Sequence, residues 1–285
     1  MHTETERRKV TYQEAYRRGY ERLEAAGITD ARTDTWILME AVSGMSRALY
    51  LAERDRPMPP EMEARFREMT EKRTRRIPVQ YLTGEQEFMG YSFRVTPDVL
   101  IPRQDTEVLV ETVEKALKPG MRVLDMCTGS GCIAVSLALR HPKIQVQASD
   151  ISGKALAVAQ ENARRLGAEV TFVQSDMFAE IWGPFDVIVS NPPYIPTEVI
   201  ETLQEEVRLH EPKGALDGSG DGLFFYRILA EKGGRYLKPG GRMFLEIGCE
   251  QSRDVEALLR ENGFEEIQTG KDLAGLDRVV TGVVK

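Results

Sequence analysis

The sequence has few of the residues that build metal sites and disulfide frameworks. Its 285 residues include three cysteines and three histidines, and no two cysteines form a C-x-x-C pair. The cysteines and histidines do not cluster along the chain, which argues against a zinc site. A low and odd number of cysteines also fits a protein of a reducing compartment.

Long apolar runs are missing as well. The sequence contains no stretch of about 18 apolar residues, so we expect no membrane span. Its first ten residues are polar and charged and lack the apolar core of a signal peptide. These absences predict a cytoplasmic protein that has no membrane partner.

The chain also lacks an excess of positive charge. Its net charge is −7, whereas a protein that binds duplex nucleic acid presents a cationic face. Nucleic acid is therefore not expected to be a required partner. Hydrophobic residues make up 41% of the chain and charged residues 29%, which is enough apolar material for one large or two modest domains.

The first third of the chain has the apolar spacing of helices. Between residues 11 and 76, apolar residues recur three and four positions apart, as at Tyr12, Ala15 and Tyr16. The charged stretch 61–76 predicts a helix with a solvent-exposed face, and a docking surface is the alternative reading. Aromatic and β-branched residues then mix with glycine and proline between 81 and 101, which is typical of a β-hairpin.

From Thr106 onwards, apolar strands alternate with helical stretches. The strands are expected at 121–126, 145–149, 170–174, 185–190, 241–247, 264–269 and 277–283. Such alternation predicts an α/β fold with a seven-stranded, mostly parallel, Rossmann-like sheet covered by helices on both faces. We therefore predict a small helical domain at 1–79, a hairpin linker at 80–105 and an α/β domain at 106–285.

A glycine-containing turn follows the first strand of the predicted sheet. Asp125 ends this strand, and Gly129 and Gly131 then allow a tight turn whose backbone can approach a ligand. The spacing is D-x-x-x-G-x-G rather than the G-x-G-x-x-G of dinucleotide enzymes. An acidic strand end favours a ligand with an ammonium group, such as the methionine part of S-adenosylmethionine, over a phosphate.

Acidic residues also end the next two strands. Asp150 comes 21 residues after Gly129, where an acid typically bonds ribose hydroxyls. Asp176 ends the third strand and is expected to flank an adenine. A single such acid could merely cap the next helix, but three of them beside a glycine turn predict a nucleoside ligand at the carboxyl ends of the strands.

The fourth strand runs into Ser190-Asn191-Pro192-Pro193-Tyr194. Proline cannot continue a strand ladder, so the chain leaves the sheet here and is held stiff by two prolines. A planar NH₂ group offers two donors, which the Asn191 side-chain oxygen and the Pro192 carbonyl can accept. Tyr194 adds an aromatic wall. A rigid turn without a binding role is the alternative.

Together, residues 125–131, Asp150 and residues 191–194 resemble class I amino methyltransferases, which include DNA adenine-N6 and protein glutamine-N5 enzymes. Other stretches resemble the HemK-type release factor glutamine methyltransferases, namely residues 76–84, 88–93, 100–107, 211–212 with 215–216, 221–223 and 246–248. The resemblance covers about residues 75–283, and the helical front matches only loosely.

This resemblance implies a cofactor, S-adenosyl-L-methionine, which leaves as S-adenosyl-L-homocysteine. It implies a protein substrate, the glutamine of the Gly-Gly-Gln motif in class I peptide chain release factors, and hence a part in translation termination. The implied cofactor contacts are Cys127, Thr128, Gly129, Ser130, Gly131, Asp150, Met177 and Asn191. The implied substrate contacts are Asn191, Pro192, Pro193 and Tyr194, of which Asn191, Pro192 and Tyr194 are also the expected catalytic residues. Met177 departs from the pattern, because the family often has an aromatic residue there, and Cys127 stands where glycine is common.

Other functions are compatible with parts of this pattern. A ribosomal-protein glutamine methyltransferase shares the same motifs, whereas an adenine methyltransferase should carry a basic target-recognition region, which is missing here. The loop spacing and residues 191–194 disfavour a dinucleotide-dependent dehydrogenase. A noncatalytic nucleoside-binding scaffold is the non-enzymatic alternative. No general base is evident from the sequence.

Overall fold

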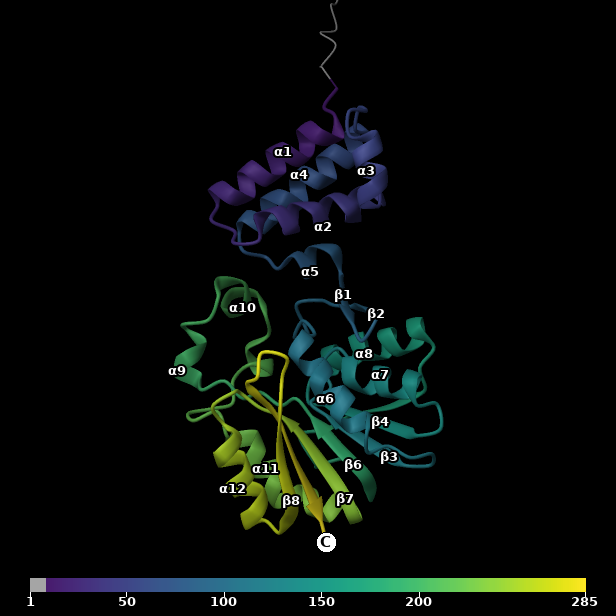
Figure 1. Cartoon of the computed structure of the whole chain (residues 1–285), viewed down its shortest axis with the longest axis vertical. Coiled ribbons are helices and arrows are strands. Elements are labelled where there is room, and N and C mark those ends of the chain that lie inside the picture. Colours follow the sequence, from purple (N-terminus) through teal and green to yellow (C-terminus); the bar gives the residue numbers. More distant parts are fainter. Residues whose placement is uncertain (1–8) are drawn as a thin grey trace, which may run out of the picture. The chain divides into compact units, whose positions relative to one another are not determined.

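A computed structural model describes residues 9–285 (Figure 1). The chain forms two compact units. One contains the residues up to Gly84 together with 205–210, and the other contains 85–204 and 211–285. Residues 1–8 lie outside the described part. They include His2, which was counted in the prediction of no zinc site, and most of the polar residues on which the prediction of no signal peptide rested.

The first unit is built of helices, as the sequence predicts for residues 11–76. Its first helix starts with a capping box, in which the Thr11 hydroxyl accepts from the Glu14 N–H and the Glu14 carboxylate accepts from the Thr11 N–H. The helices are α1 (Tyr12–Ala25), α2 (Ala31–Ser43), α3 (Arg47–Glu53), α4 (Pro60–Thr74), α5 (Val79–Thr83) and α10 (Glu205–His210).

A small core holds these helices together. Leu38, Met39 and Phe66 are among its fully or almost fully buried side chains. Gly19 lets α1 approach α4 closely, because a Cβ at this position would lie 2.8 Å from the Phe66 ring. Any larger residue at position 19 would therefore have to displace that ring.

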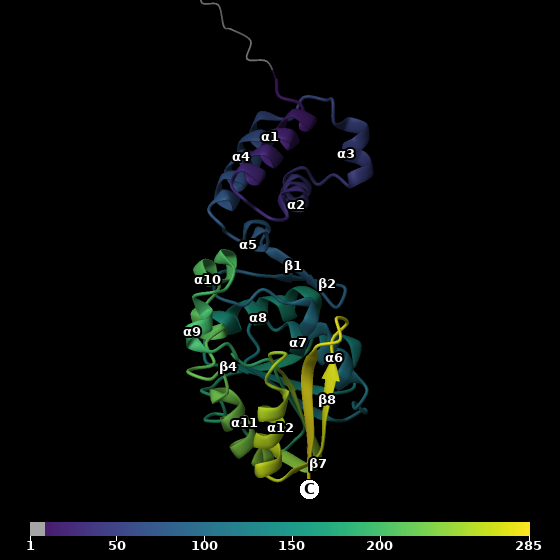
Figure 2. The same cartoon turned by 60° about the vertical axis from the view of Figure 1, so that its left-hand side comes forward.

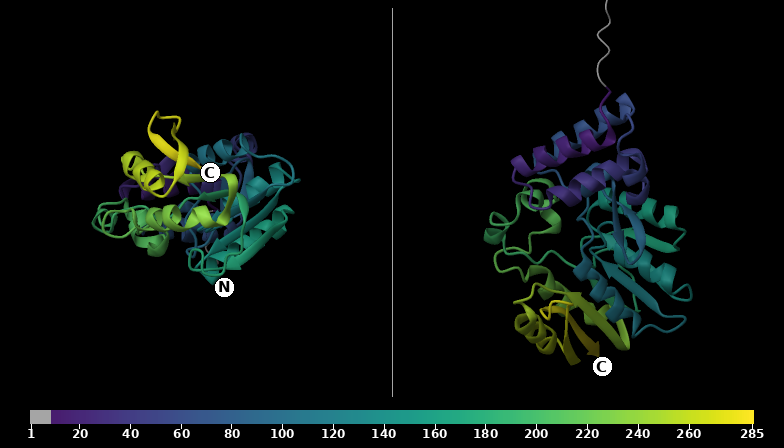
Figure 3. Two further views of the ribbon diagram at one scale, coloured as in Figure 1. Left: turned by 90° about the horizontal axis from the view of Figure 1, so that it is seen from below. Right: turned by 45° about the horizontal axis from the view of Figure 1, so that its top comes forward.

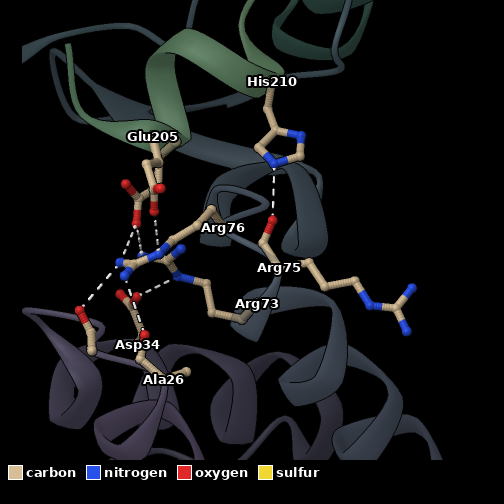
Figure 4. Close-up of polar contacts among 9 residues, drawn as sticks. Ala26, Asp34, Arg73, Arg75, Arg76, Glu205 and His210 are labelled. Atoms are coloured by element: carbon tan, nitrogen blue, oxygen red, sulfur yellow. Dashed lines mark hydrogen bonds and ion pairs between the residues drawn. The ribbon is translucent and has the colours of Figure 1, made fainter. Parts of the chain in front are cut away.

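A charge network with a buried centre ties α10 to α4 within this unit (Figure 4). Arg73 Nε lies 2.7 Å from Asp34 Oδ2, and its Nη2 lies 3.0 Å from Glu206 Oε1. Arg76 Nε lies 2.9 Å from Glu205 Oε2, and it also donates to the carbonyls of the α1–α2 turn. Burial raises the pKa of Asp34 even though Arg73 lowers it. The charged stretch 61–76 therefore contains one arginine that is buried rather than solvated.

The second unit is built around the predicted seven-stranded sheet. Its strands are β3 (Arg122–Met126), β4 (Gln145–Asp150), β5 (Val170–Gln174), β6 (Phe185–Ser190), β7 (Leu237–Glu246), β8 (Phe264–Lys271) and β9 (Asp277–Val284). They lie in the order β5-β4-β3-β6-β7-β9-β8, in which the first five are parallel and β9 is antiparallel to both neighbours. Figure 3 shows the β8–β9 pair, at the yellow end of the colour scale, forming one edge. The predicted fold class is confirmed.

Helices cover both faces of this sheet because successive side chains of its central strands point to opposite faces and are apolar on both. Val123 and Val187 face one cluster, and Leu124 and Ile188 face the other. The first cluster is covered by α6 (Gln104–Glu114), α7 (Cys132–Arg140) and α8 (Gly153–Leu166), and the second by α11 (Phe224–Gly233) and α12 (Ser252–Glu261). The remaining short elements are α9 (Thr197–Ile200), η1 (Lys213–Ala215) and η2 (Gly234–Tyr236).

The predicted hairpin forms from β1 (Glu85–Phe88) and β2 (Tyr91–Arg94), which lie beside α8 (Figure 2). Phe88 and Phe93 are buried in the core of the α/β unit, with their rings edge to face. The hairpin is thus packed onto the second unit rather than free.

No helix within residues 9–285 is both long and apolar enough to cross a membrane.

Candidate functional site

The two predicted ligand segments follow neighbouring strands of the sheet. The chain winds outward from β3 to β4 and β5 and then returns to place β6 on the other side of β3. Open α/β sheets bind ligands beyond the carboxyl ends of strands at such a switch point. Met126 of β3 pairs with Ser190 of β6, and the Ser190 hydroxyl donates to the Met126 carbonyl at 2.7 Å. The glycine loop (residues 127–131) and the Asn-Pro-Pro-Tyr corner (residues 191–194) therefore begin side by side.

Asp125 braces the glycine loop from the inside. Its side chain is fully buried, and its Oδ2 accepts from the Thr128 hydroxyl at 2.5 Å and from the Ala134 N–H at 3.2 Å. Burial raises the pKa of Asp125 to about 7, although these two donors lower it. Its Oδ1 has no hydrogen-bond partner within residues 9–285. The sequence placed this acid at the strand end but did not assign it a bracing role.

The backbone of the loop is shaped for a close approach. Cys127, Gly129 and Gly131 all have positive φ angles, of 62°, 56° and 80°. Gly131 also lies against α8, because a Cβ there would come within 2.9 Å of the Ala159 Cβ. Asn162 on α8 donates to the Ser130 carbonyl at 2.9 Å. The loop is thus tied to the helix behind it at Ser130 and Gly131, whereas nothing lies within 4 Å of a Cβ built at Gly129.

Asp150 lies next to this loop at the end of β4. Its Oδ2 accepts from the Gly129 N–H and its Oδ1 from the Ser152 N–H, both at 2.9 Å. Burial raises the pKa of Asp150, and these N–H groups oppose that shift. The N-cap of α8 is Ser152, whose hydroxyl accepts from the Ala155 N–H. The alternative reading of Asp150 as the helix cap is therefore wrong.

Met177 lies against Cys127, the first residue of the glycine loop. It is buried, and its backbone has a φ of 47°. The Cys127 and Met177 sulfur atoms lie 4.0 Å apart, so the two residues that depart from the family pattern are neighbours. Burial raises the pKa of the Cys127 thiol, which keeps it protonated. Asp176, which the sequence placed beside an adenine, is exposed to solvent.

The Asn191 side chain is oriented by a helix that the sequence analysis did not connect to it. Its Nδ2 donates to the Thr106 hydroxyl at 3.2 Å, and Thr106 is almost fully buried in the first turn of α6. Pro192 and Pro193 are buried, while Asn191 and Tyr194 are partly exposed. The amide NH₂ of Asn191 thus faces the protein.

The backbone at Tyr194 is held by two later segments. Its carbonyl accepts from Gln251 Nε2 at 3.0 Å, and Ile195 exchanges backbone hydrogen bonds with Leu216 and Gly218. Gly222 lies close to the same carbonyl, because a Cβ at position 222 would be 2.3 Å from the Tyr194 oxygen. Burial raises the pKa of Tyr194, so the phenol stays protonated near neutral pH.

The sequence analysis missed the supporting residues Thr106, Asn162, Glu246 and Gln251. Thr106 and Glu246 belong to stretches that carry the family resemblance, 100–107 and 246–248, but no spacing in those stretches shows which residue they contact. Glu246 ends β7 and is 1% exposed, and the residue before it, Leu245, pairs with Ser190, the residue before Asn191. Its contacts became evident only from the fold.

Two family models match successive parts of the chain. Residues 14–84 match the model described as the PrmC N-terminal domain, and residues 103–222 match the model described as the methyltransferase small domain.

Curated relatives are similar along almost the whole chain. The release factor glutamine methyltransferase of Geobacter sulfurreducens is 45% identical over 266 residues, covering 93% of both proteins. That of Moorella thermoacetica is 44% identical over 275 residues, covering 94% of this chain and 97% of the relative. A solved methyltransferase from Pyrococcus furiosus has a similar fold, with a TM-score of 0.53 and 17% identity over 69% of this chain and 90% of its own. The chain therefore belongs to the release factor glutamine methyltransferase family.

Proposed function

We propose that this protein transfers a methyl group from S-adenosyl-L-methionine to the side-chain amide nitrogen of the glutamine in the Gly-Gly-Gln motif of class I peptide chain release factors. The observation that carries the proposal is the Asn-Pro-Pro-Tyr corner beside the glycine loop at the switch point, in a chain whose relatives bear this activity in their names.

The residues at the switch point fit the cofactor. The backbone of Cys127–Gly131 would hold the methionine part, and the fixed carboxylate of Asp150 would accept from ribose hydroxyls. Met177 would pack against the adenine ring, since a thioether makes favourable contacts with aromatic faces. When bound, the cofactor supplies an electrophilic methyl group and is released as S-adenosyl-L-homocysteine.

The corner would hold the target amide through acceptors. Pro192 and Pro193 have no N–H, so the backbone there offers carbonyl oxygens and no competing donors. Because Asn191 Nδ2 is engaged by Thr106, the Asn191 Oδ1 is left to accept one amide hydrogen, and the Pro192 carbonyl accepts the other. An amide lone pair is delocalised, and holding its nitrogen in line for attack is worth roughly 7–11 kcal/mol. The neutral phenol of Tyr194 would exclude water from the target amide rather than act as a base.

No side chain at this corner is a strong base, so the proton leaves after methyl transfer, when the nitrogen has become acidic. Asn191→Ala should lower kcat by orders of magnitude while the Kd for S-adenosyl-L-methionine changes little. Unchanged turnover in this variant would remove the role given to Asn191.

We further propose that residues 1–79 recognise the substrate, that 80–105 act as a linker and that 106–285 carry catalysis. The helical unit has a hollow lined by Tyr16, Tyr20, Tyr50, Arg17 and Arg54. Arg47 stacks over the Trp36 ring at 5.4 Å on a neighbouring part of this surface. Tyrosine, tryptophan and arginine are the residues most enriched at binding hot spots, which supports recognition of the body of the release factor here.

Charge reversal tests this part of the proposal. Arg17→Glu and Arg47→Glu should raise the KM for a whole release factor by about 10-fold and leave the KM for a short Gly-Gly-Gln peptide unchanged. Arg67→Glu, on the exposed side of α4, is the matched control. An equal effect of all three variants would contradict recognition by this surface.

The reaction itself is tested by transfer of labelled methyl groups to a purified release factor. A release factor with Gln→Ala in its Gly-Gly-Gln motif, a pool of ribosomal proteins and DNA are assayed beside it. We expect label on the intact release factor alone, with no nucleic acid required, and we place the reaction in the cytoplasm, where release factors act. Label on a ribosomal protein or on DNA would move the substrate to one of the alternatives above.

A further inference from the structure

Glu246 is a buried acid to which the methyl-transfer chemistry above gives no role. It ends β7 and is 1% exposed, and its Oε2 has no hydrogen-bond partner among the described residues. An unpaired buried carboxylate oxygen is costly, so such groups are rare in folded proteins. This acid is therefore a candidate for a role in the site beside it.

The sheet places Glu246 next to Asn191 and under α6. Ser190 of β6 pairs with Leu245 of β7, so the residues that follow them, Asn191 and Glu246, come next to each other. Side chains alternate along a strand, and Phe244 faces the cluster covered by α6. Glu246, two residues later, points to the same side, where α6 places Thr106.

Thr106 is the side chain through which Glu246 can act on Asn191. The Thr106 hydroxyl accepts from Asn191 Nδ2 at 3.2 Å, and it has a single hydrogen of its own to donate. Burial raises the pKa of Glu246 to about 7, and the hydroxyl of Thr106 is the strongest influence that lowers it, ahead of Arg278 and Asn191. The ionised form of Glu246 can only accept, so donation of this hydrogen to it would complete a hydrogen-bonded series from Asn191 through Thr106 to Glu246.

We propose that Glu246 is a positioning residue that determines which way the Asn191 amide faces. As the final acceptor of the series it keeps the Asn191 NH₂ turned inward, through Thr106, and so keeps the Asn191 Oδ1 turned toward the target amide. The proposal rests on the role of Asn191 in the proposed function.

Glu246 would have this effect because the Asn191 amide can face Thr106 either with its NH₂ or with its Oδ1. Without a carboxylate at position 246, the Thr106 hydroxyl is free to donate to Asn191 Oδ1 instead. The amide can then turn, which would present its NH₂ donors to the NH₂ donors of the target glutamine. Such a site would still bind the cofactor but would hold the nitrogen of the target in the wrong place.

The first test is Glu246→Gln in the full-length protein. Glutamine has the same shape, but its NH₂ can donate to the Thr106 hydroxyl and so reverse the series. We expect kcat to fall by about 100-fold, the loss typical of an atom misplaced by about 1 Å, with the KM for the release factor and the Kd for S-adenosyl-L-methionine within about two-fold. Glu114→Gln, at the other end of α6, is the matched control and should keep its kcat.

A double-mutant cycle separates positioning from a general structural effect. In an Asn191→Ala background, Glu246→Gln should cause no further loss, because the two residues act through the same amide. Losses that multiply would overturn the proposal, as would a Glu246→Gln enzyme with unchanged kcat. A fully active Asn191→Ala enzyme would instead contradict the role of Asn191 in the proposed function, on which the role of Glu246 depends.

A second pair of variants covers the possibility that Glu246→Gln does not fold. Thr106→Val removes the middle hydroxyl and Thr106→Ser keeps it, while the buried carboxylate stays in place. We expect Thr106→Ser to retain most of its kcat and Thr106→Val to lose it, with equal binding of S-adenosyl-L-methionine. Equal kcat in the two variants would overturn the proposal.

Discussion

Replacing Gly222 with alanine should displace the Asn-Pro-Pro-Tyr corner without replacing any residue that is proposed to contact a ligand. Gly222 has a φ of 76°, and an added Cβ would lie 2.3 Å from the Tyr194 carbonyl oxygen. Contacts below 3.0 Å are essentially never seen for real Cβ atoms. One of the two backbone segments must therefore move by at least about 0.7 Å, and Gln251, whose Nε2 would be 2.7 Å from the new Cβ, must also move.

The expected effect has two parts. A positive φ costs a residue other than glycine roughly 1–2 kcal/mol, which lowers the free energy of unfolding. The displacement adds an effect on catalysis, because a shift of about 1 Å in a positioned group can cost about 100-fold in rate. We therefore expect kcat to fall by about 10- to 100-fold, with little change in the Kd for S-adenosyl-L-methionine.

Gly120→Ala is the matched control. Gly120 has a φ of 86°, but nothing lies within 4 Å of a Cβ there, and it precedes β3 at the opposite end of the sheet. Labelled methyl transfer to a release factor gives kcat, and chemical denaturation gives stability. Both variants should lose the stability that a positive φ costs, and Gly222→Ala should lose more because of the overlap at its Cβ. Only Gly222→Ala should lose kcat. Equal kcat in the two variants would refute the reasoning.

Three further predictions concern the carboxylates of Asp150, Asp34 and Asp125. Asp150→Ala should raise the Kd for S-adenosyl-L-methionine by about 10- to 100-fold, since hydrogen bonds to charged groups contribute about 1.5–3 kcal/mol; calorimetry that gives an unchanged Kd would contradict a ribose contact. Arg73→Leu should lower the free energy of unfolding by about 3–5 kcal/mol because it leaves Asp34 as an unpaired buried charge. The double variant with Asp34→Leu should regain most of this free energy, as measured by urea denaturation. The pKa of Asp125 is about 7 when folded and about 4 when unfolded, so the folded protein keeps a proton that the unfolded chain has released. The contribution of Asp125 to stability is therefore largest below about pH 4 and is lost as the pH rises to about 7, and Asp125→Asn should flatten this slope in melts at several pH values.

The central strands of the sheet, such as β3 and β6, were predictable because each is a short apolar run between turn residues. The largest error is at β7, which was expected at 241–247 and begins at Leu237. Residues 238–241, Lys-Pro-Gly-Gly, have the composition of a turn. They are accommodated because the pairing with β6 shifts register between Phe185 and Val187, and such an irregularity depends on the partner strand rather than on local sequence.

The site was predictable only where its residues constrain their own backbone. Glycines 129 and 131 and prolines 192 and 193 impose local geometry, so their turns could be inferred without knowing their neighbours. Thr106 and Gln251 contact the corner through tertiary packing across many residues, and nothing in their local sequence indicates this. The same applies to Arg73, which lies in a charged stretch and is nevertheless buried because Asp34 and Glu206 surround it.

The membership of α10 in the helical unit affects the order in which the protein can fold during synthesis. After Gly84 the ribosome must add about 125 residues before Glu205–His210 are complete, which takes roughly 6–25 s at the usual rate of 5–20 residues per second. During this time Arg73 has Asp34 as a partner but lacks Glu206, and Arg76 lacks both acidic partners. The nascent helical unit therefore carries an incompletely neutralised arginine pair until residues 85–204 of the second unit have been made, and a fragment that ends at Gly84 would remain in that state permanently.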